Sequence, residues 1–165
     1  ELTPSADPEA IAAVLRELAQ SFDFVVVDTP GTYSAAVAAA LDESTTVLLV
    51  TSADMASVKD ARMAVSALRR EGFSEDRVKL VVNHATNANS VTEADIAKTV
   101  GCEVFWSIPH DRAVPVSTQR GEPLVLADPQ AKMAKRVQAM AALIGGAGEG
   151  VDEGGTMFGM FRRGR

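Results

Sequence analysis

Four short apolar runs recur along the chain, and a segment with helical periodicity lies between each run and the next. The runs are FVVVD (24–28), TVLLV (46–50), KLVVN (79–83) and EVFWSI (103–108). None alternates cleanly between apolar and polar residues, which is the pattern of strands covered by helices on both faces. This order predicts an α/β fold with a doubly wound, mostly parallel sheet, flanking helices and right-handed crossovers.

The segments between the runs carry signals that begin and end helices. Asp7 is a candidate N-cap before Pro8 at the first helical position, and Thr92 and Gly101 are placed to cap and close a later helix. Helices are therefore expected over 8–20, 34–42, a stretch from Val58 to Leu68 that ends at Gly72, 92–100, and 129–144.

Chain length and composition predict one domain followed by two short segments. The chain has 165 residues, of which residues 1–144 hold all the predicted strands and helices. Residues 145–156 are rich in glycine and acids, so we expect a flexible linker there. Residues 157–165, MFGMFRRGR, form a short tail that is first apolar and then basic.

Charge and cysteine content narrow the functional classes. A net charge of −6 disfavours a general electrostatic grip on nucleic acid. Cys102 is the only cysteine, so an internal disulfide is excluded and a reducing compartment, the cytoplasm, is expected. Neither a membrane-spanning run nor a signal peptide is found in this sequence.

Metal and nucleophile chemistry have little support. The only histidines, His84 and His110, lack the spacing of zinc ligands, so we expect them in turns or on the surface. Cys102 has no nearby base and is expected to pack, and no G-x-S-x-G motif is present.

Residues that end strands are the candidates for chemistry, because ligands of open parallel sheets bind beyond the carboxyl ends of the strands. Asp28 ends the first run. A carboxylate there can bind a Mg²⁺ water or orient an attacking water, while Thr29, Pro30 and Gly31 turn the backbone so that an amide can face an anion. The alternative is that Asp28 only caps the turn that follows it.

Asn83 ends the third run. Its amide offers one donor and one acceptor side, the combination that reads the edge of an adenine. Asparagine is also a common turn residue, so a purely structural role stays open.

Taken in order, these segments resemble the ParA/MinD superfamily of deviant P-loop ATPases over residues 8–144. The resemblance rests on VVVDTP, LVVN and GEPLVLADP in sequence. Within the superfamily the chain looks most like the CpaE/TadZ type, which positions the tight-adherence (Flp-type) pilus machinery. The resemblance implies a partial P-loop NTPase-like fold that binds ATP and Mg²⁺.

The resemblance also assigns roles to the candidate residues. It implies that Asp28 is the acid of the second switch, which handles the Mg²⁺ shell and the catalytic water. Thr29, Pro30 and Gly31 match the switch backbone near the γ-phosphate.

The base-binding side of the site is implied in the same way. Asn83 matches the asparagine that reads adenine, and Pro109 and Asp111 match the segment that passes by the nucleoside.

One departure from the family pattern is large. The glycine-rich phosphate loop of these ATPases ends in Gly-Lys, and the chain contains no Gly-Lys pair. The resemblance places the first strand and the P-loop upstream of Glu1, so we expect the C-terminal part of an ATPase domain, either truncated or naturally degenerate. The alternatives are a localisation scaffold without hydrolysis, or a cell-division or partitioning ATPase of the MinD/ParA type.

The expected partners follow from the resemblance. They are a second copy in a homodimer of the intact protein, and pilus-assembly or polar-localisation proteins. The tail of residues 157–165 could make a weak peripheral contact with the inner face of the cell membrane, or it could be a frayed terminus. Nucleic acid is not an expected partner.

Overall fold

The computed structural model describes residues 7–84 and 91–146. They fall into two compact units, Glu1–Val47 and Leu48–Arg165. The expected tail, and the expected linker from residue 147 onward, lie outside the described residues.

The first unit is a pair of helices, α1 (Pro8–Ser21) and α2 (Ala35–Glu43). The α1 helix begins as predicted, because the Asp7 carboxylate accepts the backbone N–H of Glu9 at 3.1 Å and Pro8 follows it. Arg16 of α1 forms an ion pair with Glu43 of α2 at 2.6 Å. This contact joins the two helices, and the hydrogen bond to Glu43 raises the pKa of Arg16.

The predicted strand at 24–28 is not formed. Residues 24–28 have no regular secondary structure, and Phe24 and Val26 are 65% and 94% exposed. An isolated strand leaves its backbone N–H and C=O groups without ladder partners, so apolar composition cannot form one without a neighbouring strand. No described residue pairs with this segment.

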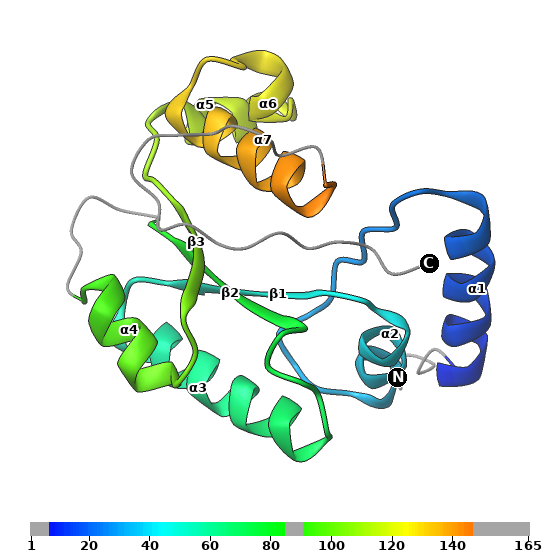
Figure 1. Cartoon of the computed structure of the whole chain (residues 1–165). Coiled ribbons are helices and arrows are strands. Elements are labelled where there is room, and N and C mark those ends of the chain that lie inside the picture. Colours follow the sequence, from blue (N-terminus) through cyan, green and yellow to red (C-terminus); the bar gives the residue numbers. More distant parts are fainter. Residues whose placement is uncertain (1–6, 85–90, 147–165) are drawn as a thin grey trace, which may run out of the picture. The chain divides into compact units, whose positions relative to one another are not determined.

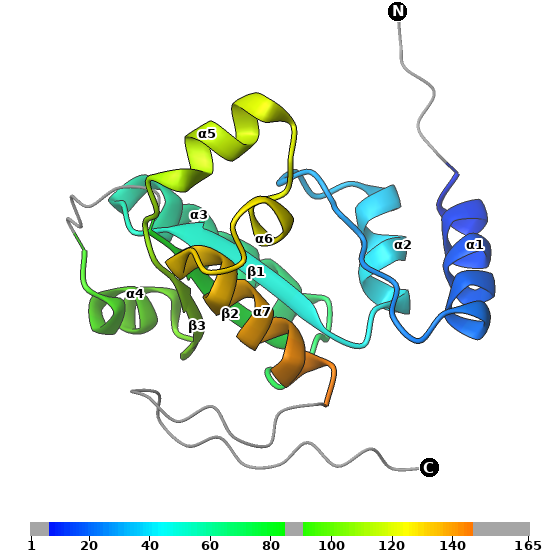
Figure 2. The ribbon, with the colours of Figure 1, turned by 90° about the horizontal axis from the view of Figure 1, so that it is seen from above.

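The second unit holds the sheet (Figure 1). Its elements in chain order are β1 (Val47–Ser52), α3 (Met55–Arg70), β2 (Val78–Asn83), α4 (Glu93–Val100), β3 (Val104–Ile108), α5 (Ala113–Arg120), α6 (Leu124–Ala127) and α7 (Lys132–Ile144). The strand order is β1-β2-β3, and β2 pairs with β3 in parallel. Helices α3 and α4 lie on one face of the sheet and α7 on the other, as Figures 1 and 2 show together. The α/β class with a parallel sheet is confirmed.

The core of this unit is centred on β2. Leu80, Val81 and Val82 are at most 1% exposed, and Val58 of α3 and Ile96 of α4 are fully buried as well. Burial on both faces of β2 agrees with the apolar run Leu80–Val82 at its centre.

Strand β1 is less buried than the sequence predicted for a strand covered on both faces. It lies at one side of the three-stranded sheet, and its Leu48 and Val50 are 39% and 59% exposed. A strand at the edge of a sheet has fewer neighbours to cover its side chains, so its apolar run is only partly buried.

Two helices and one helix start were not predicted. Helix α5 contains Pro115, a residue that favours an interruption but is tolerated in the first turn of a helix. Helix α6 is too short to show a periodicity. Helix α7 begins at Lys132 rather than 129, because the preceding residues form a turn in which the Asp128 carboxylate accepts the backbone N–H of Gln130.

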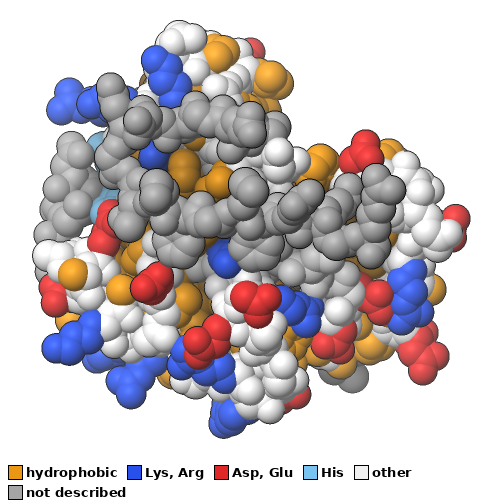
Figure 3. Space-filling model, viewed as in Figure 1, with side chains coloured by type: hydrophobic (Ala, Val, Ile, Leu, Met, Phe, Trp, Pro, Cys, Tyr) orange, Lys and Arg blue, Asp and Glu red, His pale blue; other side chains and the backbone are white. Residues whose placement is uncertain are grey.

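The surface of the described residues carries charges of both signs. On the face seen in Figure 3, the visible Lys and Arg side chains are interspersed with Asp and Glu rather than gathered into one basic patch. Within residues 7–84 and 91–146, none of the helices has both the length and the apolar character needed to cross a membrane.

Replacing Leu80 tests the assignment of β2 as the centre of the core. We expect Leu80→Ala to lower the free energy of unfolding by about 2–5 kcal/mol, because a fully buried leucine leaves a cavity. Urea unfolding followed by the fluorescence of Trp106, the only tryptophan, reports on this unit directly. Leu126→Ala is the matched control, and its 76% exposure limits the expected change to about 0.5 kcal/mol. Equal losses in the two variants would contradict the assignment.

Candidate functional site

The carboxyl ends of β2 and β3 meet at one edge of the sheet. Asn83, the last residue of β2, is half-buried and lies opposite Ile108, the last residue of β3. The backbone N–H of His84 donates to the carbonyl of Ile108 at 2.9 Å, which extends the ladder one residue past β2. The candidate adenine-reading side chain is therefore attached to a firmly held strand end.

The segment after β3 brings Pro109 and Asp111 to the same edge. Both carboxylate oxygens of Asp111 accept backbone N–H groups, Oδ1 from Ala113 at 2.9 Å and Oδ2 from Met133 at 3.2 Å. The hydrogen bond from Ala113, followed by that from Met133, lowers the pKa of Asp111. Asp111 thus ties the start of α5 to the start of α7 and fixes the path of the segment that contains Pro109.

A hollow of about 440 Å³ opens beside this segment. It is lined by His110, Asp111, Arg112, Asp128, Gln130, Ala131 and Lys132. A larger hollow of about 530 Å³ lies at the opposite edge of the sheet, where Val78 begins β2 and Phe105 follows the start of β3. We place the candidate site at the carboxyl edge despite the difference in size, because ligands of parallel sheets bind there.

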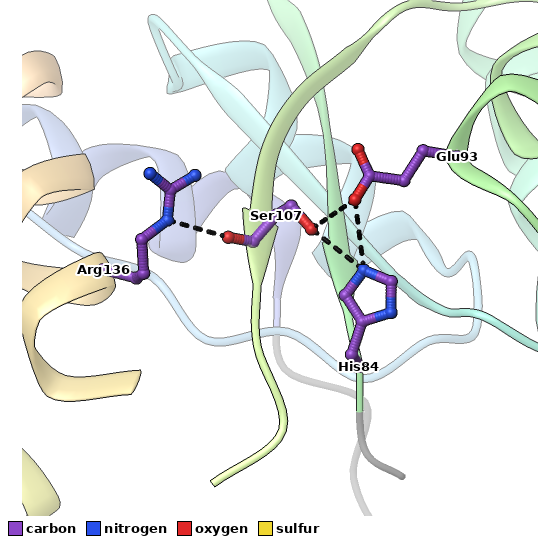
Figure 4. Close-up of polar contacts among 4 residues, drawn as sticks. All are labelled: His84, Glu93, Ser107 and Arg136. Atoms are coloured by element: carbon purple, nitrogen blue, oxygen red, sulfur yellow. Dashed lines mark hydrogen bonds and ion pairs between the residues drawn. The ribbon is translucent and has the colours of Figure 1, made fainter. Parts of the chain in front are cut away.

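A polar cluster that the sequence did not predict stands next to Asn83 (Figure 4). His84 Nε2 lies 3.2 Å from Glu93 Oε1 and 2.9 Å from Ser107 Oγ, and the Ser107 hydroxyl donates to Glu93 Oε1 at 2.7 Å. His84 was expected in a turn or on the surface. It directly follows β2, outside regular secondary structure, and its side chain is 13% exposed. The one sequence signal was its place directly after a predicted strand.

The second candidate group lies in the first unit. Asp28, Thr29, Pro30 and Gly31 are all exposed and follow the segment that forms no strand. A Cβ built on Gly31 would have no atom within 4 Å. The structure thus brings Asn83, Pro109 and Asp111 together in one unit and describes Asp28–Gly31 in the other, so the roles assigned to all seven residues remain predictions.

The described residues suit a Mg²⁺ ion that is held by only one or two protein ligands, rather than a metal site built entirely from side chains. No cluster of three or more His, Cys, Asp or Glu side chains suited to a metal occurs within the described residues. Mg²⁺ is usually held by one or two carboxylates together with substrate phosphates and waters. The lone carboxylate of Asp28, with the hydroxyl of Thr29 beside it, is compatible with that mode of binding.

A protein-family model described as "Cellulose biosynthesis protein BcsQ" matches residues 3–144. The chain belongs to the BcsQ family. It is thereby also a member of the ParA/MinD superfamily of ATPases, which confirms the superfamily inferred from the sequence. The match does not single out the CpaE/TadZ type.

A curated relative agrees with the superfamily. The septum site-determining protein MinD of Thermotoga maritima is 25% identical over 146 residues, which cover 86% of this chain and 54% of the relative. The BcsQ-family chain spans about half the length of the curated relatives it matches.

Two solved structures share the fold. The MinC:MinD cell division protein complex of Aquifex aeolicus matches with a TM-score of 0.74 at 23% identity, over 90% of this chain and 63% of that chain. MinD of Pyrococcus horikoshii, complexed with Mg-ADP, matches with a TM-score of 0.67 at 20% identity, over 84% of this chain and 59% of that one.

The two hydrogen bonds that the Asp111 carboxylate accepts predict a loss of stability at low pH. Its pKa in the folded protein lies below the ordinary value of 3.8, so its contribution is complete above pH 3.8 and is lost as the pH falls through the folded-state pKa. We expect Asp111→Asn to lower the urea midpoint at neutral pH, and the difference from the wild type to shrink below about pH 4.

Urea titrations of both proteins between about pH 3 and 7 measure this difference. Asp60→Asn, at an exposed position of α3, is the control and should leave the midpoint unchanged. A difference between wild type and Asp111→Asn that is the same at every pH would rule out the charged carboxylate as the cause.

Proposed function

We propose that this chain is the C-terminal part of a ParA/MinD-type ATPase, which binds and hydrolyses ATP together with a P-loop that precedes Glu1 in the intact protein. The observation that carries the proposal is that Asn83 lies opposite Ile108, directly before the segment of Pro109 and Asp111, at the carboxyl ends of β2 and β3. The family membership and the VVVDTPGT motif support it.

The second unit would supply the base-binding half of the site. Asn83 is placed to pair with the adenine edge, since its amide offers a donor and an acceptor side by side. Pro109 would pass by the nucleoside on a segment that Asp111 holds in place through Ala113 and Met133. Each of these residues lies on or directly after a strand, so the binding surface needs little ordering when nucleotide arrives.

The phosphate half would be shared between Asp28–Gly31 and the P-loop. Asp28 and Thr29 would hold Mg²⁺ there, and the ion would supply positive charge against the negative charge that develops on the phosphate. In this proposal Asp28 holds a water of the Mg²⁺ shell and orients the attacking water, while the backbone of Thr29, Pro30 and Gly31 faces the γ-phosphate. The open space around Gly31 is consistent with close approach of a ligand to the backbone.

We also propose that the intact protein is a homodimer that positions machinery at the cell envelope. The sequence motifs favour pilus machinery of the CpaE/TadZ type, whereas the name of the matching family points to cellulose synthesis. A cytoplasmic protein with a weak membrane contact through residues 157–165 would suit either role.

A localisation scaffold without hydrolysis is the second candidate. It would apply if the intact protein had no Gly-Lys phosphate loop upstream of these 165 residues, which contain no Gly-Lys pair. Phosphate release distinguishes the two candidates, because only the ATPase releases phosphate in a way that depends on Asp28.

The intact protein with Asp28→Asn tests the ATPase. We expect phosphate release to fall by about 100-fold or more, because positioned carboxylates of this kind contribute at least that factor. Binding of ATP with Mg²⁺, measured by calorimetry, should be retained because the adenine contacts are untouched.

Asp23→Asn is the matched control, an exposed aspartate just before the same apolar run. It should leave both phosphate release and ATP binding unchanged. If the wild type binds ATP but releases no phosphate, the scaffold replaces the ATPase. If Asp28→Asn hydrolyses ATP at the wild-type rate, the role of Asp28 is wrong.

A further inference from the structure

One carboxylate oxygen joins three elements beside Asn83. Glu93 Oε1, at the first residue of α4, accepts the hydroxyl of Ser107 in β3 at 2.7 Å. His84, the residue after β2, brings its Nε2 to 3.2 Å from the same oxygen and 2.9 Å from Ser107 Oγ. Figure 4 shows the three side chains converging, and we call them the His84–Glu93–Ser107 latch.

The three side chains of the latch admit a consistent assignment of donors and acceptors. An ionised carboxylate only accepts, so the single hydroxyl proton of Ser107 points to Glu93. Ser107 Oγ then presents a lone pair to His84, and both neighbours of Nε2 are acceptors. An N–H on His84 Nε2 can donate to either of these acceptors.

The latch is anchored from the other side of β3 as well. Arg136 of α7 donates from Nε to the Ser107 carbonyl at 3.2 Å, and its guanidinium lies 4.0 Å from the centre of the Trp106 ring. Trp106 Nε1 returns a hydrogen bond to the Arg136 carbonyl at 3.1 Å. Ser107 is thus fixed through its backbone by α7 and through its side chain by Glu93 and His84.

Asn83 is directly coupled to this arrangement through its peptide bond to His84. The main chain of His84 is held by Ile108 at 2.9 Å, and its side chain, 13% exposed, is held by Glu93 and Ser107. We infer that the His84–Glu93–Ser107 latch positions Asn83 and so sets how strictly the site selects adenine over guanine. This inference rests on the proposed function, in which Asn83 reads the base.

Base selection should be more sensitive to the latch than overall affinity. The phosphates and Mg²⁺ are common to ATP and GTP, and their contacts do not involve β2 in the proposed site. A two-pronged contact to a base edge, in contrast, weakens steeply when its angles change. Loss of the latch therefore lowers the preference for ATP over GTP while much of the shared affinity stays.

The test measures the dissociation constants of Mg-ATP and Mg-GTP by calorimetry in the intact protein. We expect His84→Ala and Glu93→Ala each to lower the ATP-over-GTP affinity ratio about threefold or more, as part of the roughly tenfold discrimination of one bidentate base contact. The double variant should lose little more than either single one, because both changes break the same interaction.

Two further variants separate positioning from a general loss of stability. His84→Gln keeps an N–H donor that can reach Glu93, so most of the ratio should be restored. Glu103→Ala, an exposed glutamate just before β3 at the opposite edge of the sheet, is the control and should keep the wild-type ratio. Hydrogen exchange of the peptide containing residues 82–84 should be faster in Glu93→Ala than in the control.

Each outcome decides the inference. A lower ratio in His84→Ala and Glu93→Ala, with rescue by His84→Gln, supports it. Equal weakening of both nucleotides, with an unchanged ratio, would overturn the latch as a positioning device and leave the ATPase proposal intact. Wild-type protein that binds neither nucleotide would overturn the proposed function and the selectivity role together.

Discussion

The parallel pairing of β2 with β3 is the interaction on which the described part of the site depends. Its register places Asn83 opposite Ile108, and the ladder continues to the backbone of His84. The pairing is stable because Leu80, Val81 and Val82 are completely enclosed by helices on both sides of the sheet. A polar residue, Asn83, can then end β2 at little cost, since the core residues lie one to three positions before it.

Local signals were read correctly from the sequence because they act within one turn. Asp7 caps α1, and Thr92 caps α4 through the backbone N–H of Asp95. Gly101 closes α4 in the left-handed conformation, with a φ of 75°. A residue with a Cβ is strained at such a φ, which is why glycine there marks the helix end so reliably.

Long-range features were predicted less well, for two different reasons. The cluster of His84, Glu93 and Ser107 joins residues 9 to 23 positions apart, and only the β2–β3 register and the start of α4 bring them together. The prediction of a strand at 24–28 was wrong for a different reason. These residues have the composition of a strand, but no described residue pairs with them. Composition specifies a tendency to form a strand, whereas the strand itself needs neighbours on the sheet.

The unpaired segment connects the fold to the proposed chemistry. Four apolar residues in a row, Phe24 to Val27, are between 37% and 94% exposed, which is unfavourable by about 25 cal/mol for each Å² of apolar surface left in water. A neighbouring strand would recover that free energy and at the same time satisfy the backbone of 24–28.

In the proposed ATPase, such pairing would also hold Asp28 at a strand end instead of leaving it on an irregular segment. The base-binding residues are different in this respect, since β2 and β3 already fix Asn83 and Pro109. The two halves of the proposed site therefore differ in what they require. In the proposal, the residues that would read the base all lie in one folded unit, whereas Asp28 would need a neighbouring strand to be held at a strand end.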